Sequence, residues 1–404
     1  MLIKSIRTFI DRRGTVNRAL VLASGYAISQ GVVLLAMPLL ARRFGTADFG
    51  LLANLLTVSN IALNLGALRL DHAILVSDTE DDANRLRDAA LTLALLWGIV
   101  IAAPMLLLSR WGSLWPEYVW LVSTTVLLVT STQAVAMTLL RQGRIRSVAI
   151  LRASQGVMFV ALALTSGMGL GLSFAFSWIL GAMSFLPWAL VRPRLGPMIS
   201  ATMRYGRFPM LGSLGTLMDV VGFSVVVWTM SSSFGLADCG RITQAQRLVG
   251  APMLLLALSL GPVLQRSWAD DVSAGPVRLV SSFRRACNLL TITAIAWLLV
   301  VVLCGPQLTH ILLGEGWVED RWLLAALSAA ACARSVVSPL SGILIVRREF
   351  KKCTAWQAAY FAIAVVVLPA AASWIDLRSF VFLYSAFEIV MYCTYLVIIR
   401  RSLG

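Results

Sequence analysis

Two copies of one seven-residue motif decide the fold of this chain. The first copy is Phe44-Gly-Thr-Ala-Asp-Phe-Gly50, and the second is Phe234-Gly-Leu-Ala-Asp-Cys-Gly240. Phe, Gly, Ala, Asp and Gly occupy the same places in both, and each copy lies between two long apolar runs. Two unrelated helix hairpins can share a Gly and an Asp. Matches at this many corresponding places instead favour a chain built as two similar halves.

The chemistry of the motif suits a tight connection between two helices. A glycine in the left-handed conformation commonly ends a helix, and we expect this conformation at Gly45 and Gly235. An aspartate at the start of the next helix can accept hydrogen bonds from its first free N–H groups. Asp48 and Asp238 have that position.

The chain is far more apolar than soluble proteins are. Of its 404 residues, 59% are hydrophobic and 13% are charged, and the mean hydropathy is +0.83. Apolar runs recur at lengths of about 20 residues, which as helix would cross the ~30 Å hydrocarbon core of a bilayer. In lipid each run must satisfy its own backbone polar groups, which requires a helix. The sequence therefore predicts an all-α polytopic membrane protein.

Twelve transmembrane helices are expected, in two six-helix bundles. The predicted spans are 18–41, 49–72, 89–108, 115–140, 147–165, 169–190, 209–233, 242–264, 286–304, 322–346, 353–373 and 378–399. The predicted segments are a basic N-terminal segment (1–17), the N-terminal bundle (18–190), a linker (191–208), the C-terminal bundle (209–399) and a tail (400–404).

The orientation follows from the distribution of Lys and Arg. With the N-terminus in the cytoplasm, most of the 34 basic residues lie in cytoplasmic segments, as the positive-inside rule requires. Both termini are then cytoplasmic. Because six spans separate the two motif copies, the copies share one orientation, and the bundles would be parallel repeats about an axis along the membrane normal.

Several functions are disfavoured by the sequence. The net charge of +15 is accounted for by the topology, so it does not indicate nucleic-acid binding. The six cysteines and two histidines have no metal-ligand spacing. There is no catalytic constellation, no Gly-rich phosphate loop and no large soluble segment that would carry one, so we expect neither an enzyme nor a cofactor.

Charged residues inside the spans are the candidate site. An arginine at a span centre costs about 2.5–3.5 kcal/mol to insert, so it usually faces water, a partner or a ligand. These arginines are Arg69, Arg152, Arg247 and Arg334. The first three lie near enough to a membrane face to snorkel, and that alternative stays open. Two acids lie as deep, Asp219 and Glu388. Either could pair with Arg334, or bind H⁺ or Na⁺ for coupling.

Amides inside the spans are the second set of candidates. Asn54, Asn60 and Asn64 recur at helical spacing in the second span, and Gln155 and Gln246 lie in two others. Such residues could line a polar cavity and bind sugar hydroxyls. They could equally hold neighbouring helices together through hydrogen bonds in lipid.

The first hairpin also resembles a known family. The residues are Ala23-Ser-Gly, Gln30, the run from Pro38 to Gly50, and Leu68-Arg-Leu-Asp-His-Ala-Ile-Leu75 followed by an acidic loop. This pattern resembles the polysaccharide transporter (Wzx-type) branch of the MOP flippase superfamily. The close match covers about residues 18–85, and the twelve-span layout extends it to the whole chain.

The resemblance implies a flippase of the bacterial inner membrane. Such proteins move polyprenyl-pyrophosphate-linked oligosaccharide repeat units to the periplasmic leaflet by alternating access, for O-antigen, capsule or exopolysaccharide synthesis. The implied partners are this cargo, membrane lipids, a polysaccharide polymerase and a chain-length regulator. The family's cavity is cationic, and the matching candidates here are Arg42, Arg69, Arg152, Arg247 and Arg334. The second motif copy departs from the pattern, because Ser231-Ser-Ser233 precedes it without an arginine.

Two other functions remain open from the sequence. A MATE-like multidrug or cation antiporter would expect acids in its cavity, whereas arginines outnumber acids here. A non-transporting scaffold of a polysaccharide assembly complex would tolerate apolar residues at the polar positions inside the spans.

Overall fold

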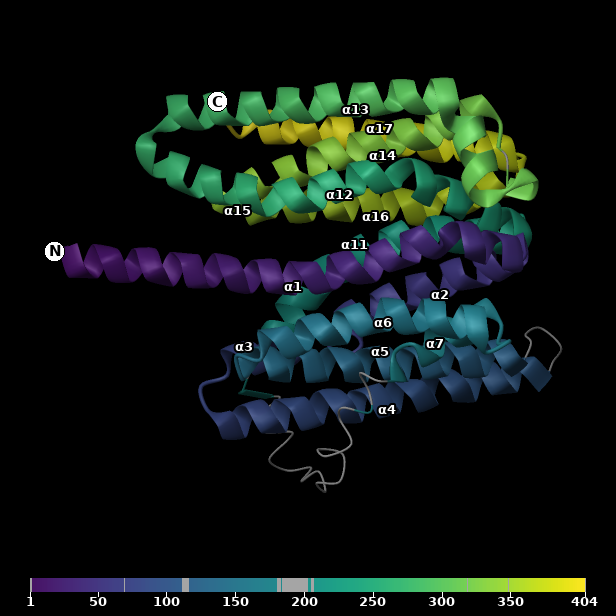
Figure 1. The fold of residues 1–404 in the computed structure, drawn as a ribbon, viewed down its shortest axis with the longest axis horizontal. Coiled ribbons are helices and arrows are strands. Elements are labelled where there is room, and N and C mark those ends of the chain that lie inside the picture. The colour runs from purple at the N-terminus through teal and green to yellow at the C-terminus, as the bar shows by residue number, and fades with distance from the viewer. Residues whose placement is uncertain are drawn as a thin grey trace. The chain divides into compact units, whose positions relative to one another are not determined.

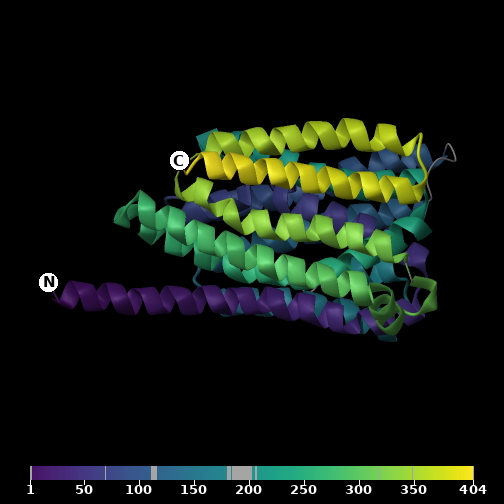
Figure 2. The ribbon, with the colours of Figure 1, turned by 90° about the horizontal axis from the view of Figure 1, so that it is seen from above.

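The computed structural model describes residues 2–68, 70–110, 116–179, 183, 203–204, 207–317, 319–347 and 349–403. Within these ranges, the side chains of 2–20, 101–110, 116–119, 207–216 and some single positions are not described. The described residues form helices and turns and contain no strand (Figures 1 and 2). The prediction of an all-α polytopic membrane protein is confirmed.

The helices follow one another through short connections. They are α1 (Leu2–Arg43), α2 (Thr46–Leu65), α3 (Leu70–Val76), α4 (Glu80–Arg110), α5 (Pro116–Arg141), α6 (Ile145–Thr165), α7 (Leu170–Phe176), α11 (Arg207–Ser233), α12 (Leu236–Ala274), α13 (Pro276–Leu313), the 3-10 turn η1 (Glu315–Trp317), α14 (Arg321–Leu340), α15 (Gly342–Val346), α16 (Phe350–Ala372) and α17 (Leu377–Arg401). Among the described residues, eight helices are long and apolar enough to cross a membrane.

Two predicted spans are broken in the structure. The span 49–72 ends as α2 at Leu65 and resumes as α3 at Leu70, and Leu68 between them has a φ of 47°. The span 322–346 breaks after Leu340, where Pro339 removes one backbone donor and Ser341 forms the turn. A continuous apolar run does not reveal such breaks, because hydropathy does not report backbone dihedral angles.

Other helices extend well beyond the predicted spans. The helix α4 begins at Glu80, and its first turn holds three acids, which are favourable at the positive end of a helix dipole. The helix α13 begins with Pro276 at its first position, where proline needs no N–H partner. The backbone of predicted segment 1–17 continues α1 from Leu2. Most of the predicted linker, 191–208, lies outside the described residues.

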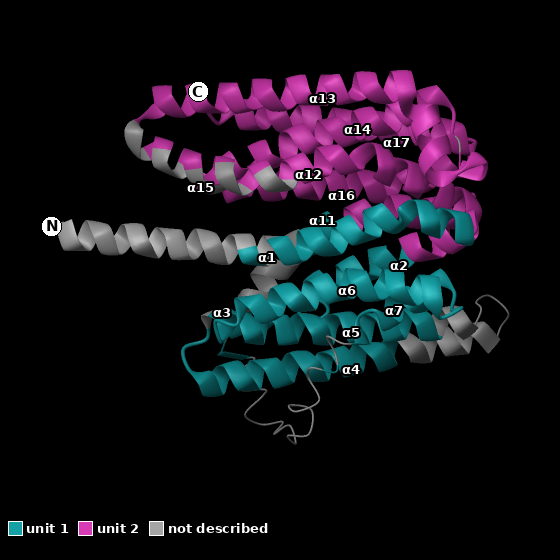
Figure 3. Ribbon diagram, in the orientation of Figure 1, with its two compact units in different colours: residues 1–44, 54–220 teal, residues 45–53, 221–404 magenta. Residues whose placement is uncertain are grey.

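The chain divides into two compact units (Figure 3). Unit 1 consists of residues 1–44 and 54–220, and unit 2 of residues 45–53 and 221–404. In unit 1, α1 packs on α6 and α4 packs on α5. In unit 2, α14 packs on α12, α13 and α17. The first motif copy thus falls largely in unit 2, with the second copy. The boundaries of the two predicted bundles stay a prediction.

The two motif copies pack directly on each other inside unit 2. A Cβ added to Gly50 would lie 1.9 Å from the carbonyl oxygen of Leu236, and a Cβ added to Gly240 would lie 1.9 Å from that of Thr46. Gly50 corresponds to Gly240 in the repeat, and Thr46 corresponds to Leu236. The contact is therefore reciprocal, as two copies of one element related by a two-fold axis would produce.

The connections within the motif differ from expectation in part. Gly235 has a φ of 91°, which favours glycine, but its ψ of 164° is extended and not left-handed helical. Gly45 is not among the described glycines with positive φ, so the prediction for it was wrong. Asp48 accepts a hydrogen bond from the backbone N–H of Gly45 (3.0 Å), because the third helical residue can reach back to the cap. Asp238 instead pairs with Arg241 (3.0 Å).

Close helix packing in unit 1 also depends on glycine. A Cβ at Gly25 of α1 would lie 2.4 Å from the carbonyl oxygen of Ala149 of α6. A Cβ at Gly156 of α6 would lie 2.5 Å from the backbone oxygen of Ser29 of α1. Small residues let two backbones approach in this way, which is how membrane helices associate without a hydrophobic driving force between them.

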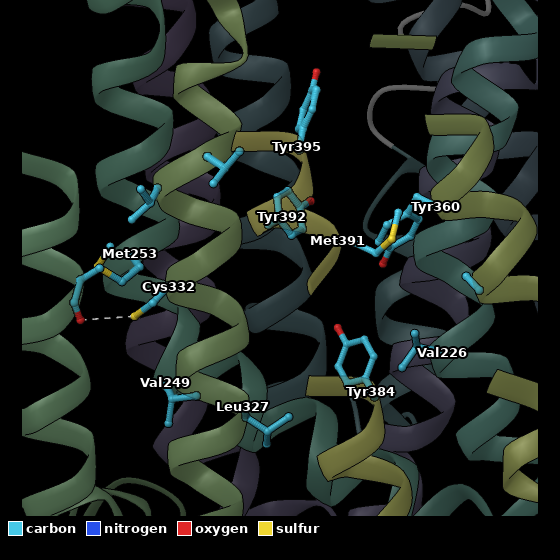
Figure 4. Packing of buried hydrophobic residues seen from close by; sticks show 14 of the residues in the cluster. Val226, Val249, Met253, Leu327, Cys332, Tyr360, Tyr384, Met391, Tyr392 and Tyr395 are labelled. Carbon is cyan, nitrogen blue, oxygen red and sulfur yellow. Dashed lines mark hydrogen bonds between the residues drawn. The ribbon is translucent and has the colours of Figure 1, made fainter. Parts of the chain in front are cut away.

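The core of unit 2 is rich in aromatic side chains (Figure 4). Trp356 of α16 stacks on Tyr395 of α17 with ring centroids 4.2 Å apart. The indole N–H of Trp356 donates to the backbone oxygen of Met391 (2.9 Å), which joins the two helices. Cys332 of α14 donates to the backbone oxygen of Ala294 of α13 (3.5 Å; dashed in Figure 4). This packing fixes α14, α16 and α17 around the polar cluster described next.

Candidate functional site

An arginine and a glutamate pair inside unit 2. The guanidinium of Arg334 on α14 donates from Nε (3.1 Å) and Nη2 (2.7 Å) to one carboxylate oxygen of Glu388 on α17. The Arg334 side chain is 34% exposed, whereas that of Glu388 is 1% exposed. The pair is therefore open at its cationic end and sealed at its anionic end.

Two tyrosines and a glutamine extend this pair. Tyr360 of α16 donates its hydroxyl to the other carboxylate oxygen of Glu388. The hydroxyl of Tyr384, one turn before Glu388 on α17, lies 3.4 Å from Nη2 of Arg334. Gln246 of α12 donates to the same Tyr384 hydroxyl (3.0 Å). Four helices thus contribute to one connected network, and both oxygens of Glu388 have donors.

Aromatic rings flank the guanidinium of Arg334. Its central carbon lies 4.5 Å from the ring centroid of Phe223 on α11 and 5.9 Å from that of Tyr392 on α17. Cation–π attraction adds to the ion pair at such distances. The rings also restrict the side chain to a narrow slot, so its planar donor edge has a defined direction for an incoming acceptor.

A second arginine of unit 2 is not balanced by an acid. Arg247 lies about three turns into α12, and its side chain is half-buried. The one described group that interacts with it electrostatically is the thiol of Cys239, and no carboxylate does so among the described residues. With Arg334 neutralised by Glu388, Arg247 leaves an excess of positive charge in the membrane-spanning part of unit 2.

The main buried arginine of unit 1 has a different environment. Arg152 of α6 donates to the side-chain oxygen of Gln133 on α5, whose amide donates to Asp71 on α3 (3.2 Å). The rings of Tyr26 and Trp178 lie 5.2 and 5.9 Å from its central carbon. All of this network except Tyr26 is buried. Gln133 therefore links a buried cation to a buried carboxylate, which is a structural arrangement.

Comparison with known proteins gives a result for the fold alone. No family model and no curated protein matches the sequence. A multidrug resistance MATE family transporter of the MOP superfamily, in its inward-facing conformation, matches with a TM-score of 0.68 at 14% identity, over 94% of each chain. The same description in the outward-facing conformation gives 0.54 at 13% identity, over 96% of this chain and 95% of that one. The chain has the fold of MOP superfamily transporters.

A third solved structure matches at a similar level. It is a MOP superfamily transporter from Pyrococcus furiosus, described with the words "reverse polarity of binding pocket suggests different function". Its TM-score is 0.53 at 13% identity, over 96% of this chain and 95% of that one. Membership of the MOP fold therefore does not by itself decide between a cationic and an anionic cargo.

The remaining predicted residues of this MOP-fold chain lie in several places. Arg42 is exposed in the last turn of α1, and Arg69 lies outside the described residues. Asp219 of α11 is half-buried and has a partner. Arg334 has Glu388 as its carboxylate partner, which was one of the two pairings expected from the sequence.

The amide candidates are all engaged in contacts. Asn64 donates to the backbone oxygen (2.8 Å) and side-chain oxygen (3.1 Å) of Asn60, one turn earlier on α2. Gln155 joins α6 to Ser29 of α1 (3.2 Å) and to Ser177 after α7 (3.1 Å). Asn54 is buried and has a partner. For Gln155 in particular, this geometry is that of a helix-to-helix bond, and Gln246 alone joins the network around Arg334.

Sequence reasoning missed Tyr360, Tyr384 and Phe223. A signal was present for Tyr384, because it lies four residues before Glu388 and so on the same helical face. Tyrosines within spans are also less expected than tyrosines at membrane interfaces. Phe223 gave no signal, since a phenylalanine in an apolar run is ordinary. Among the described residues, no group of three or more His, Cys, Asp or Glu side chains could hold a metal ion.

Proposed function

We infer that this protein is a flippase for polyprenyl-pyrophosphate-linked oligosaccharides in the bacterial inner membrane. The observation that carries the proposal is Arg247, a half-buried arginine in a membrane helix with no described carboxylate partner. Such a residue is costly in lipid unless an anion or water compensates it. The partly exposed Arg334 supplies a second guanidinium in the same unit. Guanidinium groups bind phosphate oxygens bidentately, and a pyrophosphate has several to offer.

The MOP fold suits such a cargo physically. The prenyl chain can remain in lipid while only the pyrophosphate and the sugars need a polar path. In membrane carriers built from repeats, the two halves rock about a site near the bilayer midplane and open it to each side in turn. A polysaccharide polymerase and a chain-length regulator would then use the exported unit. The resemblance of the first hairpin to Wzx-type flippases supports this choice within the superfamily.

The test is transport by the purified protein in vesicles that contain a fluorescent polyprenyl-pyrophosphate oligosaccharide. Arg247→Ala should lower the rate of headgroup translocation on the order of tenfold or more, because one phosphate-binding guanidinium is worth more than 1.4 kcal/mol at a desolvated site. Arg321→Ala is the matched control, since Arg321 is exposed at the start of α14, and its rate should match that of the wild type. Equal rates for both variants at equal folded protein would contradict the proposal.

A MATE-like antiporter for organic cations is the second candidate. The buried carboxylate of Asp71 in unit 1 favours it, because a cationic cargo needs an acid. Asp71 is hydrogen-bonded to Gln133, however, and has a further partner. Drug susceptibility of a deletion strain separates the two candidates: increased sensitivity to organic cations with normal surface polysaccharide would favour the antiporter. Unchanged polysaccharide in a strain carrying Arg247→Ala would instead favour a scaffold.

A further inference from the structure

The pair between Arg334 and Glu388 presents one donor to two competing anions. Glu388 takes Nε and Nη2 of Arg334, which is the edge that also forms a bidentate contact with a phosphate. A third of the arginine side chain is exposed, and the glutamate is not. A phosphate group that reaches the exposed part of Arg334 can gain its bidentate contact only by displacing the carboxylate.

Displacement leaves Glu388 in an unfavourable state. Its carboxylate is almost wholly buried, and its remaining donor is the hydroxyl of Tyr360. An ionised carboxylate without a cationic partner is strongly disfavoured in a buried site, so such a group takes up a proton instead. The proton comes from solvent and forms an O–H bond on the oxygen that Arg334 has left. The arginine remains charged and holds the anion.

We propose that Glu388 couples anion binding at Arg334 to the uptake of a proton. This inference rests on the proposed function and identifies the coupling ion of the same site. By linkage the effect is reciprocal: protonation of Glu388 frees Arg334 for the anion, and the anion favours protonation. Each bound headgroup would thereby carry one negative charge fewer across the membrane.

The groups around Glu388 favour a proton over a sodium ion. On the helices packed around it, the titratable or charged side chains that face the pair are Arg334 of α14, Tyr360 of α16, and Tyr384 and Tyr392 of α17. The helix α12 adds Gln246, which donates to Tyr384. Sodium requires several oxygen acceptors, whereas the partners of the Glu388 oxygens here are donors.

The test is calorimetric titration of the purified full chain with inorganic pyrophosphate. Measuring the binding heat at one pH in buffers of different ionisation enthalpy gives the number of protons taken up per anion. The wild type should take up about one more proton than Glu388→Gln, which cannot be protonated and whose own uptake reports the pyrophosphate alone. Glu388→Gln should also bind pyrophosphate on the order of tenfold more tightly, because no carboxylate competes for Arg334.

Two further variants keep the result interpretable. Glu349→Gln is the matched control, since Glu349 also pairs with an arginine, Arg347 (3.3 Å), but next to the start of α16; it should behave as the wild type. If Glu388→Gln does not fold, the double variant Arg334→Gln/Glu388→Gln keeps the site neutral. It should show no proton uptake beyond that of pyrophosphate and weaker binding than the wild type.

The outcomes separate the two proposals. Pyrophosphate binding with equal proton uptake in the wild type and Glu388→Gln overturns the inference and leaves the flippase standing. Glu388-dependent uptake in a protein that fails to translocate the lipid-linked oligosaccharide refutes the flippase and leaves the inference standing. A wild type that binds no pyrophosphate contradicts both.

Discussion

Arginines in this protein differ in what surrounds them more than in how deeply they lie. Arg152 is buried against Gln133 and aromatic rings, and Arg334 shares a carboxylate with a tyrosine. Arg247 has no described carboxylate partner. A buried cation whose hydrogen-bond partners belong to the fold stabilises that fold, whereas one without a balancing charge is available for a ligand. These residues should therefore respond differently to substitution.

Replacement of Arg152 should affect stability before it affects transport. Arg152→Leu leaves Gln133 without its donor and weakens the link to the buried carboxylate of Asp71. Breaking such a buried network costs about 3–5 kcal/mol. The thermal midpoint of the purified variant should fall clearly below that of Arg247→Ala, measured by tryptophan fluorescence in the same detergent. A midpoint equal to that of the wild type would show that Arg152 is not a structural residue.

Glu319 provides a pH-dependent contribution outside the membrane spans. Burial is the largest effect on this carboxyl and raises its pKa above the usual 4.5, although Arg241 lies 2.7 Å away and acts in the opposite sense. The close contact with Nε of Arg241 lacks hydrogen-bond geometry, so it compensates the burial only in part. The folded state therefore binds this proton at a higher pH than the unfolded chain does.

The sign of the effect follows from that difference. Between the unfolded and the folded pKa of Glu319, the folded state holds more protons, so the free energy of unfolding falls as pH rises. Glu319→Gln should remove this part of the pH dependence, which thermal midpoints measured from pH 4.5 to 8 would show as a flatter profile. Asp320→Asn, at an exposed neighbour, is the control. A steeper profile in Glu319→Gln would contradict the assignment.

Helices of the chain meet where side chains are missing. The start of α2 contacts the start of α12 through Gly50 and Gly240, and α1 contacts α6 through Gly25 and Gly156. The repeated motif could be found in the sequence because its residues are identical in both copies. Its packing partner could not, because each glycine contacts a backbone carbonyl and a carbonyl is present at every position.

A methyl group at the crossing should separate the two helices. In Gly50→Ala the new Cβ would lie 1.9 Å from the Leu236 carbonyl oxygen, so the backbone must shift. We expect a lower thermal midpoint, with a cost on the order of 1–3 kcal/mol as for other overpacked sites. The matched control is Gly31→Ala in α1, where a Cβ would have no neighbour within 4 Å. That change should be neutral or stabilising, because alanine is the better helix former. Equal losses in both variants would contradict this reading of the crossing.

At the scale of the whole molecule, composition and periodicity were sufficient for the fold class. Hydropathy and the repeat predicted an all-α membrane protein, because lipid leaves a long apolar run no alternative to a helix. The breaks after Leu65 and Leu340 escaped prediction, since they depend on local backbone conformation. The pairing of Arg334 with Glu388 was foreseen as one alternative of two. The roles of Tyr360 and Gln246 required the packing of four helices.

The charge of the cargo leads to a prediction for the complete transport cycle. One elementary charge crossing 100 mV corresponds to about 2.3 kcal/mol, and a negative headgroup leaving a negative interior moves downhill. An inside-negative diffusion potential imposed on vesicles should therefore accelerate outward translocation by the wild type. Vesicles with the potential collapsed are the reference. A rate that is independent of the potential would mean that the headgroup crosses fully neutralised.

The crossing of the two motif copies also explains which of their letters have diverged. Gly50 and Gly240 are the same residue, whereas the positions they touch hold Thr46 in one copy and Leu236 in the other. A carbonyl oxygen survives any mutation, so those positions were free to drift after the duplication that the repeat implies. The glycines had no such freedom, because any change at either one introduces a side chain where none fits.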